Sequence, residues 1–325
     1  MKKMLMALMM FGLMAFLVAC GGEKEADTSA DTPADGEAEV EEVKEAEEVE
    51  VKHKLDEEVV TVPKNPEKVV VFDFGILDTF DELGLEVAGL PKTSIPTYLE
   101  KYEDEKYTNV GSLKEPDFEA VHALQPDLII ITDRQAELYD QFKEIAPTIF
   151  VGIDNSDYMT SFKNNMDLIA EIFGKEDEMA TELAEIDEKI AAINEKVSAQ
   201  DANALITLAN EGKVSAYGPG SRFGIIHDVF GFTPADDQID SSTKHGQSIT
   251  FEYILETNPG ILFVIDRGAV IGGEASADMI ENELVKKTDA YKNEKIIYLD
   301  GEYWYLSGGG LSSVKKMVEE VEQAL

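Results

Sequence analysis

The chain has 325 residues, with 28 Lys and Arg against 66 Asp and Glu, and a formal net charge of −38. This charge argues against nucleic acid as a partner, since no segment forms a basic stripe. It also argues against docking of the protein surface on an anionic membrane. A single cysteine excludes a disulfide within the chain.

The first 19 residues predict a secretory signal peptide. Lys2 and Lys3 precede an apolar run from Met4 to Val18, and a small residue follows directly before Cys20. The run is too short for a membrane-spanning helix and ends at a cleavage-like site. We therefore expect residues 1–19 to be removed and the mature protein to be extracytoplasmic.

Residues 20–55 are predicted to form an acidic, disordered tether. Residues 21–50 contain 13 Asp and Glu, two Lys and no aromatic side chain, a composition that cannot bury enough apolar surface to fold. A buried structural role for Cys20 is disfavoured because it borders this segment. The Leu-Val-Ala-Cys sequence resembles a bacterial lipobox, which implies lipidation of Cys20 and stable anchoring by two acyl chains.

The rest of the chain suits two α/β domains, which we place at residues 56–158 and 200–325. Strands alternate with helices in both, and this order predicts mainly parallel sheets. The predicted strands are Lys68–Phe72, Glu86–Leu90, Ile149–Val151, Ala204–Leu208 and Lys295–Leu299, with a first helix over Gly75–Leu83.

Residues 159–199 are predicted to link the two lobes through a long helix. Apolar residues recur there at spacings of four and three, namely Met179, Leu183, Ile186, Ile190, Ile193 and Val197. A coiled coil is the alternative, but three heptads within a globular chain favour one amphipathic helix packed on a domain. A helix over Glu176–Ala199 is roughly 36 Å long and restricts the closure of the lobes.

An internal repeat relates the two lobes. Five residues of the first lobe recur at a constant offset of 133 positions, namely Phe118, Glu119, Pro126, Asp133 and Arg134. Each unit predicts a short helix, a turn at Pro and an apolar strand that ends in Asp-Arg. The repeat therefore predicts two similar lobes.

The chain has only three arginines, and two of them, Arg134 and Arg267, occupy the same place in the repeat. Residues just past the carboxyl ends of strands line the ligand crevice in open α/β sheets. Arg binds planar oxyanions better than Lys does, so a cleft shared by Arg134, Arg222 and Arg267 predicts an anionic ligand. The alternatives are pairing with the preceding Asp and helix capping.

Together these features resemble the helical-backbone substrate-binding lipoproteins of ABC iron importers. The matching segments are VGSLKEPDFEAVHALQPDLIIITD, HGQSITFEYILETNPGILFVIDRG and YWYLSGGG. Within that class the chain is most similar to the petrobactin-type catecholate siderophore binders of Gram-positive bacteria. The resemblance implies a monomer, anchored by lipid to the outer face of the cell membrane, that delivers a ferric siderophore to an ABC permease dimer.

The resemblance also implies roles for individual residues. An iron(III) tris-catecholate is anionic, so the three arginines would bind it, with Lys92 as a fourth charge. His245 and Tyr305 are candidates to complete the iron shell, with Tyr303 the other candidate for the tyrosine. For His245 a backbone hydrogen bond in a loop is an equal alternative. Trp304 and the two tyrosines favour core packing or stacking on a catechol ring over metal ligation.

Glu119 and Glu252 occupy equivalent places in the repeat. In this import class one acidic residue of each lobe docks on arginines of the permease, and the repeat maps that pair onto these two residues. The alternative is that each glutamate caps its own helix, where the dipole favours a negative charge.

Other functions have less support. We expect no resident cofactor, because the iron arrives within its ligand. A zinc or manganese carrier would need a His-rich set, whereas the chain has four His. A secreted α/β enzyme is disfavoured because no G-x-S-x-G or H-E-x-x-H motif occurs. Binding proteins for haem, cobalamin and hydroxamate siderophores share this fold class, so these three are the rival ligands.

Overall fold

The computed structural model describes residues 47–200, 203–271 and 277–325. The predicted signal peptide, Cys20 and most of the predicted tether lie outside the described residues. Among the residues that are described, no helix is both long and apolar enough to cross a membrane.

The predicted tether extends too far toward the folded part of the chain. β1 (Glu48–Val51) pairs antiparallel with β2 (Val60–Pro63). Val49 and Val51 are buried while the alternating glutamates are exposed. The acidic composition did not indicate this strand. Only one face of the strand needs apolar residues, and two valines at a spacing of two provide that face.

The N-terminal lobe contains a five-stranded sheet in the order β5-β4-β3-β6-β7, with every pair parallel. Its strands are β3 (Val69–Val71), β4 (Gly89–Leu90), β5 (Thr108–Asn109), β6 (Leu128–Ile131) and β7 (Thr148–Phe150). The α-helices between them are α1 (Phe74–Glu82), α2 (Phe118–Leu124) and α3 (Tyr139–Lys143). This parallel, helix-connected order confirms the α/β prediction for the first lobe.

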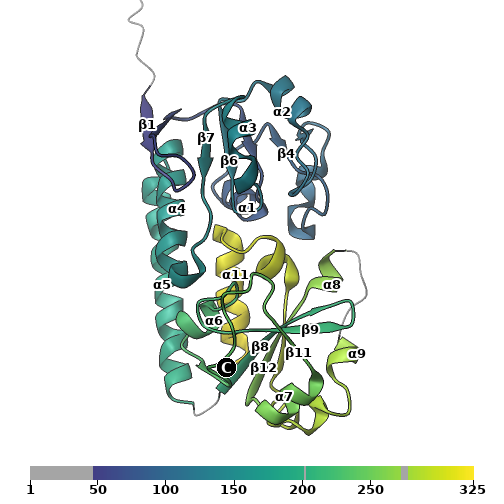
Figure 1. The fold of residues 1–325 in the computed structure, drawn as a ribbon. Helices are drawn as coiled ribbons and strands as arrows, with labels where there is room; N and C mark the ends of the chain where they lie inside the picture. The colour runs from purple at the N-terminus through teal and green to yellow at the C-terminus, as the bar shows by residue number, and fades with distance from the viewer. Residues whose placement is uncertain (1–46, 201–202, 272–276) are drawn as a thin grey trace, which may run out of the picture. The chain divides into compact units, whose positions relative to one another are not determined.

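Two packed helices connect the lobes. α4 (Tyr158–Phe173) ends at Gly174, which adopts the left-handed conformation that ends helices, and α5 (Glu176–Ser198) follows. Figure 1 shows α5 running past both sheets, with α4 beside it. The six apolar residues that predicted this helix are all buried, so the periodicity identified both the helix and its packed face.

The C-terminal lobe contains a six-stranded mixed sheet. Its main path is β11-β9-β8-β12-β13, and β10 pairs with the start of β8. The strands are β8 (Asn203–Asn210), β9 (Lys213–Tyr217), β10 (Thr233–Pro234), β11 (Gln247–Ile249), β12 (Ile261–Asp266) and β13 (Ile296–Leu299). The α-helices are α6 (Ile225–Asp228), α7 (Phe251–Thr257), α8 (Arg267–Val270), α9 (Ala277–Ile280), α10 (Asp289–Lys292) and α11 (Leu311–Gln323). β9 and β11 are antiparallel neighbours at one edge, whereas β8, β12 and β13 are parallel.

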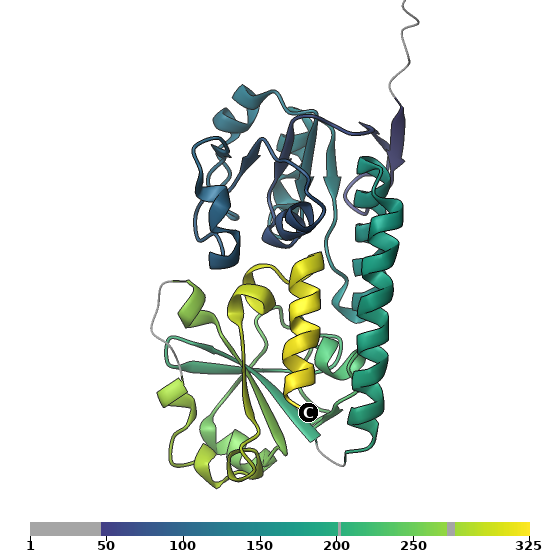
Figure 2. The ribbon, with the colours of Figure 1, turned by 180° about the vertical axis from the view of Figure 1, so that it is seen from behind.

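The C-terminal helix α11 packs along α5. Ion pairs join Lys189 to Glu319 and Lys196 to Glu322. Figure 2 shows the yellow α11 between the long teal helix and the strands of the second sheet. α11 therefore forms a second helical layer beside the linking helix.

The internal repeat is visible in the structure. α2 and α7 each span seven residues, and both end at a left-handed residue, Gln125 and Asn258 respectively. β6 starts at Leu128 and β12 at Ile261, which keeps the offset of the repeat. This equivalence confirms that the two lobes are built from similar units.

Candidate functional site

The arginines lie where the sheet topology predicts. Arg134 follows β6 after two residues, and Arg267 directly follows β12 at the start of α8. Both thus lie past the carboxyl end of a central strand. Arg222 lies in the loop between β9 and α6.

All three arginines converge on Tyr305. Its main-chain carbonyl accepts hydrogen bonds from Arg134 Nη2 at 3.1 Å and from Arg222 Nη2 at 2.6 Å. Its hydroxyl oxygen accepts from Arg267 Nε at 2.8 Å. Because Arg134 belongs to the first lobe and Tyr305 to the second, this arginine cluster joins the two lobes.

The aromatic rings of the second lobe support the cluster. The guanidinium carbon of Arg222 lies 4.3 Å from the ring centroid of Tyr305 and 5.3 Å from that of Phe223. Arg267 lies 5.4 Å from the Tyr305 centroid. Cations over aromatic faces are stabilised by the ring quadrupole, so the rings stabilise two of the guanidiniums.

The positive charges of the arginines shift pKa values within the cluster. Burial lowers the pKa of Arg222, and the positive charge of Arg134 lowers it further. Burial raises the pKa of Tyr305, but the hydrogen bond from Arg267 and the charges of Arg222 and Arg267 outweigh it, so this pKa lies below its ordinary value. The site is therefore a partly desolvated cationic cluster, which favours anionic oxygens.

Two further residues hold the arginines, and the sequence reasoning missed both. Asp73 Oδ2 accepts from Arg134 Nη1 at 3.2 Å, and Asn210 Oδ1 accepts from Arg267 Nη1 at 2.5 Å. Asp73 is also the N-cap of α1. An Asp between an apolar strand and an apolar helix is a recognisable capping signal, but nothing in the sequence joins it to Arg134.

The aromatic segment adopts a π-helical turn, Glu302–Leu306. Such turns are rare in proteins as a whole, and those that occur often lie at functional sites. Tyr303 stacks on Tyr98 of the first lobe, with ring centroids 4.5 Å apart. Trp304 is only 2% exposed, and its Nε1 donates to Glu320 at 2.8 Å. The structure therefore places Trp304 in the core rather than on the ligand-facing side, because its ring and its N–H are both already satisfied there.

The amine of Lys92 bonds backbone carbonyls of its own lobe. Its Nζ donates to the carbonyls of Glu103 at 3.0 Å and Asp104 at 2.7 Å, at the end of the 3₁₀ helix Thr97–Glu103. Carbonyls at a helix end are orphan acceptors that attract cations. The sequence did not reveal these carbonyl acceptors. They bind the ammonium group of Lys92, which we had predicted to contact the ligand.

His245 lies exposed in the loop before β11. A Cβ added at the next residue, Gly246, would lie 2.7 Å from the ring of Tyr217. Tyr217 in turn packs edge-to-face on Phe223, with ring centroids 4.7 Å apart. His245 thus neighbours the aromatic support of Arg222, while no hydrogen bond links it to the cluster among the described residues.

Glu119 and Glu252 are both exposed in the first turns of α2 and α7. The N-caps are other residues. Asp117 accepts from Ala120 N at 3.0 Å, and Thr250 accepts from Tyr253 N at 3.3 Å. Side-chain capping is therefore already provided in both helices, although the helix dipole still favours an acidic residue here.

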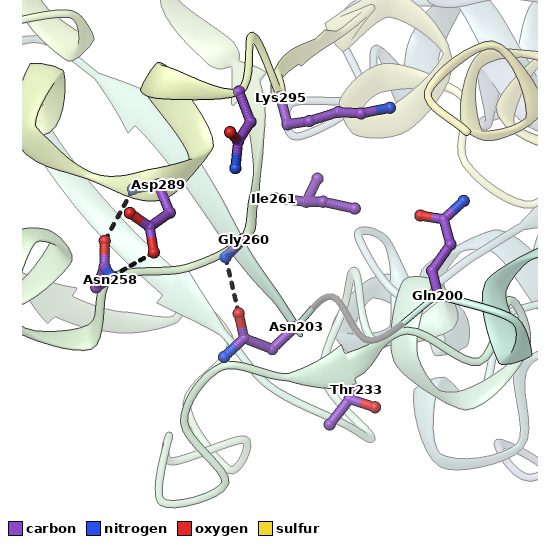
Figure 3. A pocket seen from close by; sticks show the side chains of 9 residues that line it. Gln200, Asn203, Thr233, Asn258, Gly260, Ile261, Asp289 and Lys295 are labelled. Atoms are coloured by element: carbon purple, nitrogen blue, oxygen red, sulfur yellow. Dashed lines mark hydrogen bonds between the residues drawn. The ribbon is translucent and has the colours of Figure 1, made fainter.

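A separate hollow lies at the amino-terminal ends of the strands of the second sheet (Figure 3). Asn203 starts β8, and its Oδ1 accepts from Gly260 N at 2.7 Å. Asn258 and Asp289 bond each other through side chain and backbone. These polar groups form hydrogen bonds with one another. The hollow therefore lies where loops are joined together, and we assign it no ligand.

Within the described ranges, no group of three or more His, Cys, Asp or Glu side chains is arranged as a metal site.

Comparison with known proteins gives consistent matches. A family model described as "Periplasmic binding protein" matches residues 69–303. The petrobactin-binding protein YclQ of Bacillus subtilis (strain 168) is 51% identical over 324 residues, which cover 98% of each chain. The crystal structure of YclQ superposes with a TM-score of 0.83 and covers 86% of this chain and 98% of that one. The catecholate-siderophore binding protein VctP from Vibrio cholerae has a TM-score of 0.81 and 33% identity, over 85% of this chain and 100% of that one.

Proposed function

The chain belongs to the periplasmic binding protein family, and we propose that it captures a ferric catecholate siderophore at the arginine cluster and delivers it to an ABC permease. The observation that carries this proposal is the convergence of Arg134, Arg222 and Arg267 on the oxygens of Tyr305. Charge-assisted hydrogen bonds contribute about 1.5–3 kcal/mol each. Three of them account for much of a micromolar affinity, before the cost of ordering is subtracted.

The nature of the acceptors supports a catecholate rather than another anion. Arg267 donates to a phenol oxygen, and Arg222 lies over a phenol ring. A deprotonated catechol offers the same two features, an aromatic face and a ring-bound oxygen, with a full negative charge. The relatives YclQ and VctP are named as petrobactin-binding and catecholate-siderophore binding proteins.

The proposed role is binding without catalysis, with iron as cargo and no resident cofactor. The relatives are named as binding proteins. We further propose that the mature protein is a monomer held to the outer face of a Gram-positive-type cell membrane by lipid on Cys20. Two relatives from Bacillus subtilis, YhfQ and YfiY, are named as lipoproteins.

A fluorescence titration tests the ligand class. The chain has a single tryptophan, Trp304, on the same turn as Tyr305, so a coloured ferric complex bound at the cluster quenches it. We expect ferric petrobactin or another ferric catecholate to quench with a Kd of about a micromolar or lower. Ferric hydroxamate, haem and cobalamin are the comparison ligands. Tighter binding of any of these would replace the proposed ligand class.

A further inference from the structure

Each lobe supplies one polar residue that holds its own arginine. β3 pairs with β6 and β8 pairs with β12. Asp73 lies just past the end of β3, and Asn210 is the last residue of β8. The two residues therefore occupy equivalent places, at the carboxyl end of the strand next to the arginine-bearing strand.

Asp73 is surrounded by donors. Besides Arg134, its carboxylate accepts from Thr132 Oγ1 at 3.1 Å, Gly75 N at 2.8 Å and Ile76 N at 3.2 Å. Burial raises the pKa of Asp73, and the charge of Arg134 opposes that rise. Four donors and no acceptor suit the ionised form, which is acceptor-only. Asp73 thus compensates the charge of Arg134 through a mostly buried ion pair.

Asn210 holds Arg267 with a neutral amide instead. Its Oδ1 accepts from Nη1 of Arg267, while Nε of that arginine bonds the Tyr305 hydroxyl. The partner that holds Arg134 is thus a carboxylate, whereas this partner of Arg267 is neutral. The two lobes therefore hold their arginines with similar geometry but with partners of different charge.

We infer that Asp73 and Asn210 are positioning residues that also set how much positive charge the arginine cluster offers its ligand. Each orients one guanidinium by a single hydrogen bond, and the choice of carboxylate or amide decides whether that partner adds a negative charge to the cluster. The pair thereby selects ferric complexes by their negative charge. This inference rests on the proposed function and concerns the same site.

Isosteric exchange of the two side chains tests the inference. Asp73→Asn removes one negative charge, and Asn ranks with Asp as an N-cap, so the start of α1 is preserved. Asn210→Asp adds one negative charge at the other arginine. The double variant restores the total charge but moves the carboxylate partner to the second lobe. Each is titrated with the ferric catecholate that wild type binds, at several NaCl concentrations.

Opposite effects are expected from the two single variants. Asn210→Asp weakens binding roughly tenfold at low salt, as one unit charge at about 8 Å does in a partly buried site, and its affinity depends less on salt. Asp73→Asn strengthens binding and makes the salt dependence steeper. The double variant returns close to wild type. A merely structural role predicts that both singles weaken binding and that the double is weaker than either, and this outcome would overturn the inference.

Two controls keep the result decisive. If Asp73→Asn lowers the melting temperature strongly, the comparison of Asn210→Asp with Asn210→Ala replaces it. Asn210→Ala removes the acceptor for Arg267 without adding a charge, whereas Asn210→Asp keeps an acceptor oxygen and adds a charge, so only Asn210→Asp should show a salt-dependent loss of affinity. Equal losses in the two would contradict charge selection. Failure of wild type to bind any ferric siderophore would refute the proposed function instead.

Discussion

Tyr305 is the residue on which the arginine cluster depends. Three guanidiniums lie close together, and mutual repulsion would separate them without shared acceptors. The carbonyl and hydroxyl of this one residue supply those acceptors for all three arginines. We expect an anionic ligand to replace these neutral acceptors with charged ones, which would strengthen each hydrogen bond from an arginine.

The environments of Arg134 and Arg222 lead to different expected phenotypes. Replacing either with Ala should weaken ferric catecholate binding by about 1.5–3 kcal/mol. Arg134→Ala should also lower stability by about 3 kcal/mol, because it leaves the carboxylate of Asp73 buried without its partner. Arg222→Ala leaves no such carboxylate. Titration and thermal unfolding of both variants check this. Equal losses of melting temperature would show that the Asp73 pair is not the cause.

The junction of α1 with α11 is the main contact between elements of the two lobes. Thr79 Oγ1 accepts from Leu311 N at 2.9 Å, and the carboxylate of Asp78 accepts from Ser312 N and Ser313 N at 3.2 and 3.0 Å. Side chains of α1 thus cap the N-terminus of α11 from the other lobe. This satisfies three orphan N–H groups and ties the C-terminal helix to the first lobe.

Close approach of two glycines makes this junction possible. A Cβ added at Gly75 would lie 2.5 Å from the carbonyl of Ser307 and 2.8 Å from Gly310 N. Gly75→Ala should therefore destabilise the protein by about 1–3 kcal/mol, the usual cost of overpacking. Gly308→Ala is the matched control, since its Cβ meets no atom closer than 3.2 Å. Urea unfolding of the two variants measures the difference, and similar midpoints would argue against a tight junction.

Asp78 should make the junction sensitive to pH. The residue is 0% exposed, and burial raises its pKa to about 8. A carboxyl whose folded pKa lies above its unfolded value contributes stability at low pH and loses it as pH rises through the folded pKa. We expect the melting temperature of wild type to fall between pH 5 and 9 more steeply than that of Asp78→Asn. Parallel curves for the two proteins would assign the pH dependence to other groups.

At the scale of the whole molecule, the two lobes present equivalent acidic residues. Glu119 and Glu252 are exposed on repeat-related helices whose N-caps are Asp117 and Thr250. A permease dimer offers two equivalent docking positions, and the repeat supplies one matching carboxylate for each. We therefore favour docking over capping as the role of this pair.

Uptake measurements test the docking pair. Glu119→Ala combined with Glu252→Ala should leave the Kd for the ferric siderophore unchanged and reduce iron uptake by cells. The exposed residues Glu115 and Glu256 provide a control double variant with the same charge change. Normal uptake in the first double variant at equal expression would leave helix stabilisation as the role of the two glutamates.

Anchoring is tested separately at the N-terminus. Cys20→Ser should abolish lipidation and release the protein from the cell membrane, because a lone signal peptide does not replace two acyl chains. Cell fractionation followed by high-salt and carbonate washing measures the retained fraction. Persistent membrane association of the variant after both washes would refute the lipid anchor.

From the amino-acid sequence alone we could predict the α/β class, the long helix α5 and the relation between the lobes. These features follow from patterns that neighbouring residues carry, namely the apolar spacing of four and three and the constant offset of the repeat. The comparisons confirm the family resemblance drawn from the same segments. The lobe boundaries at residues 158 and 200 and the ligand roles of individual residues stay predictions.

The groups that partner the arginines became evident only in the folded structure. Arg134 bonds Asp73 across 61 residues and Tyr305 across 171. The folded structure also showed that Trp304 lies in the core and that Lys92 closes a 3₁₀ helix. The sequence pattern marks which residues can donate or accept, but a donor's partner depends on segments that meet only when the chain is folded. Contacts between such distant segments have no local sequence pattern, because any nearby acceptor can satisfy the same donor.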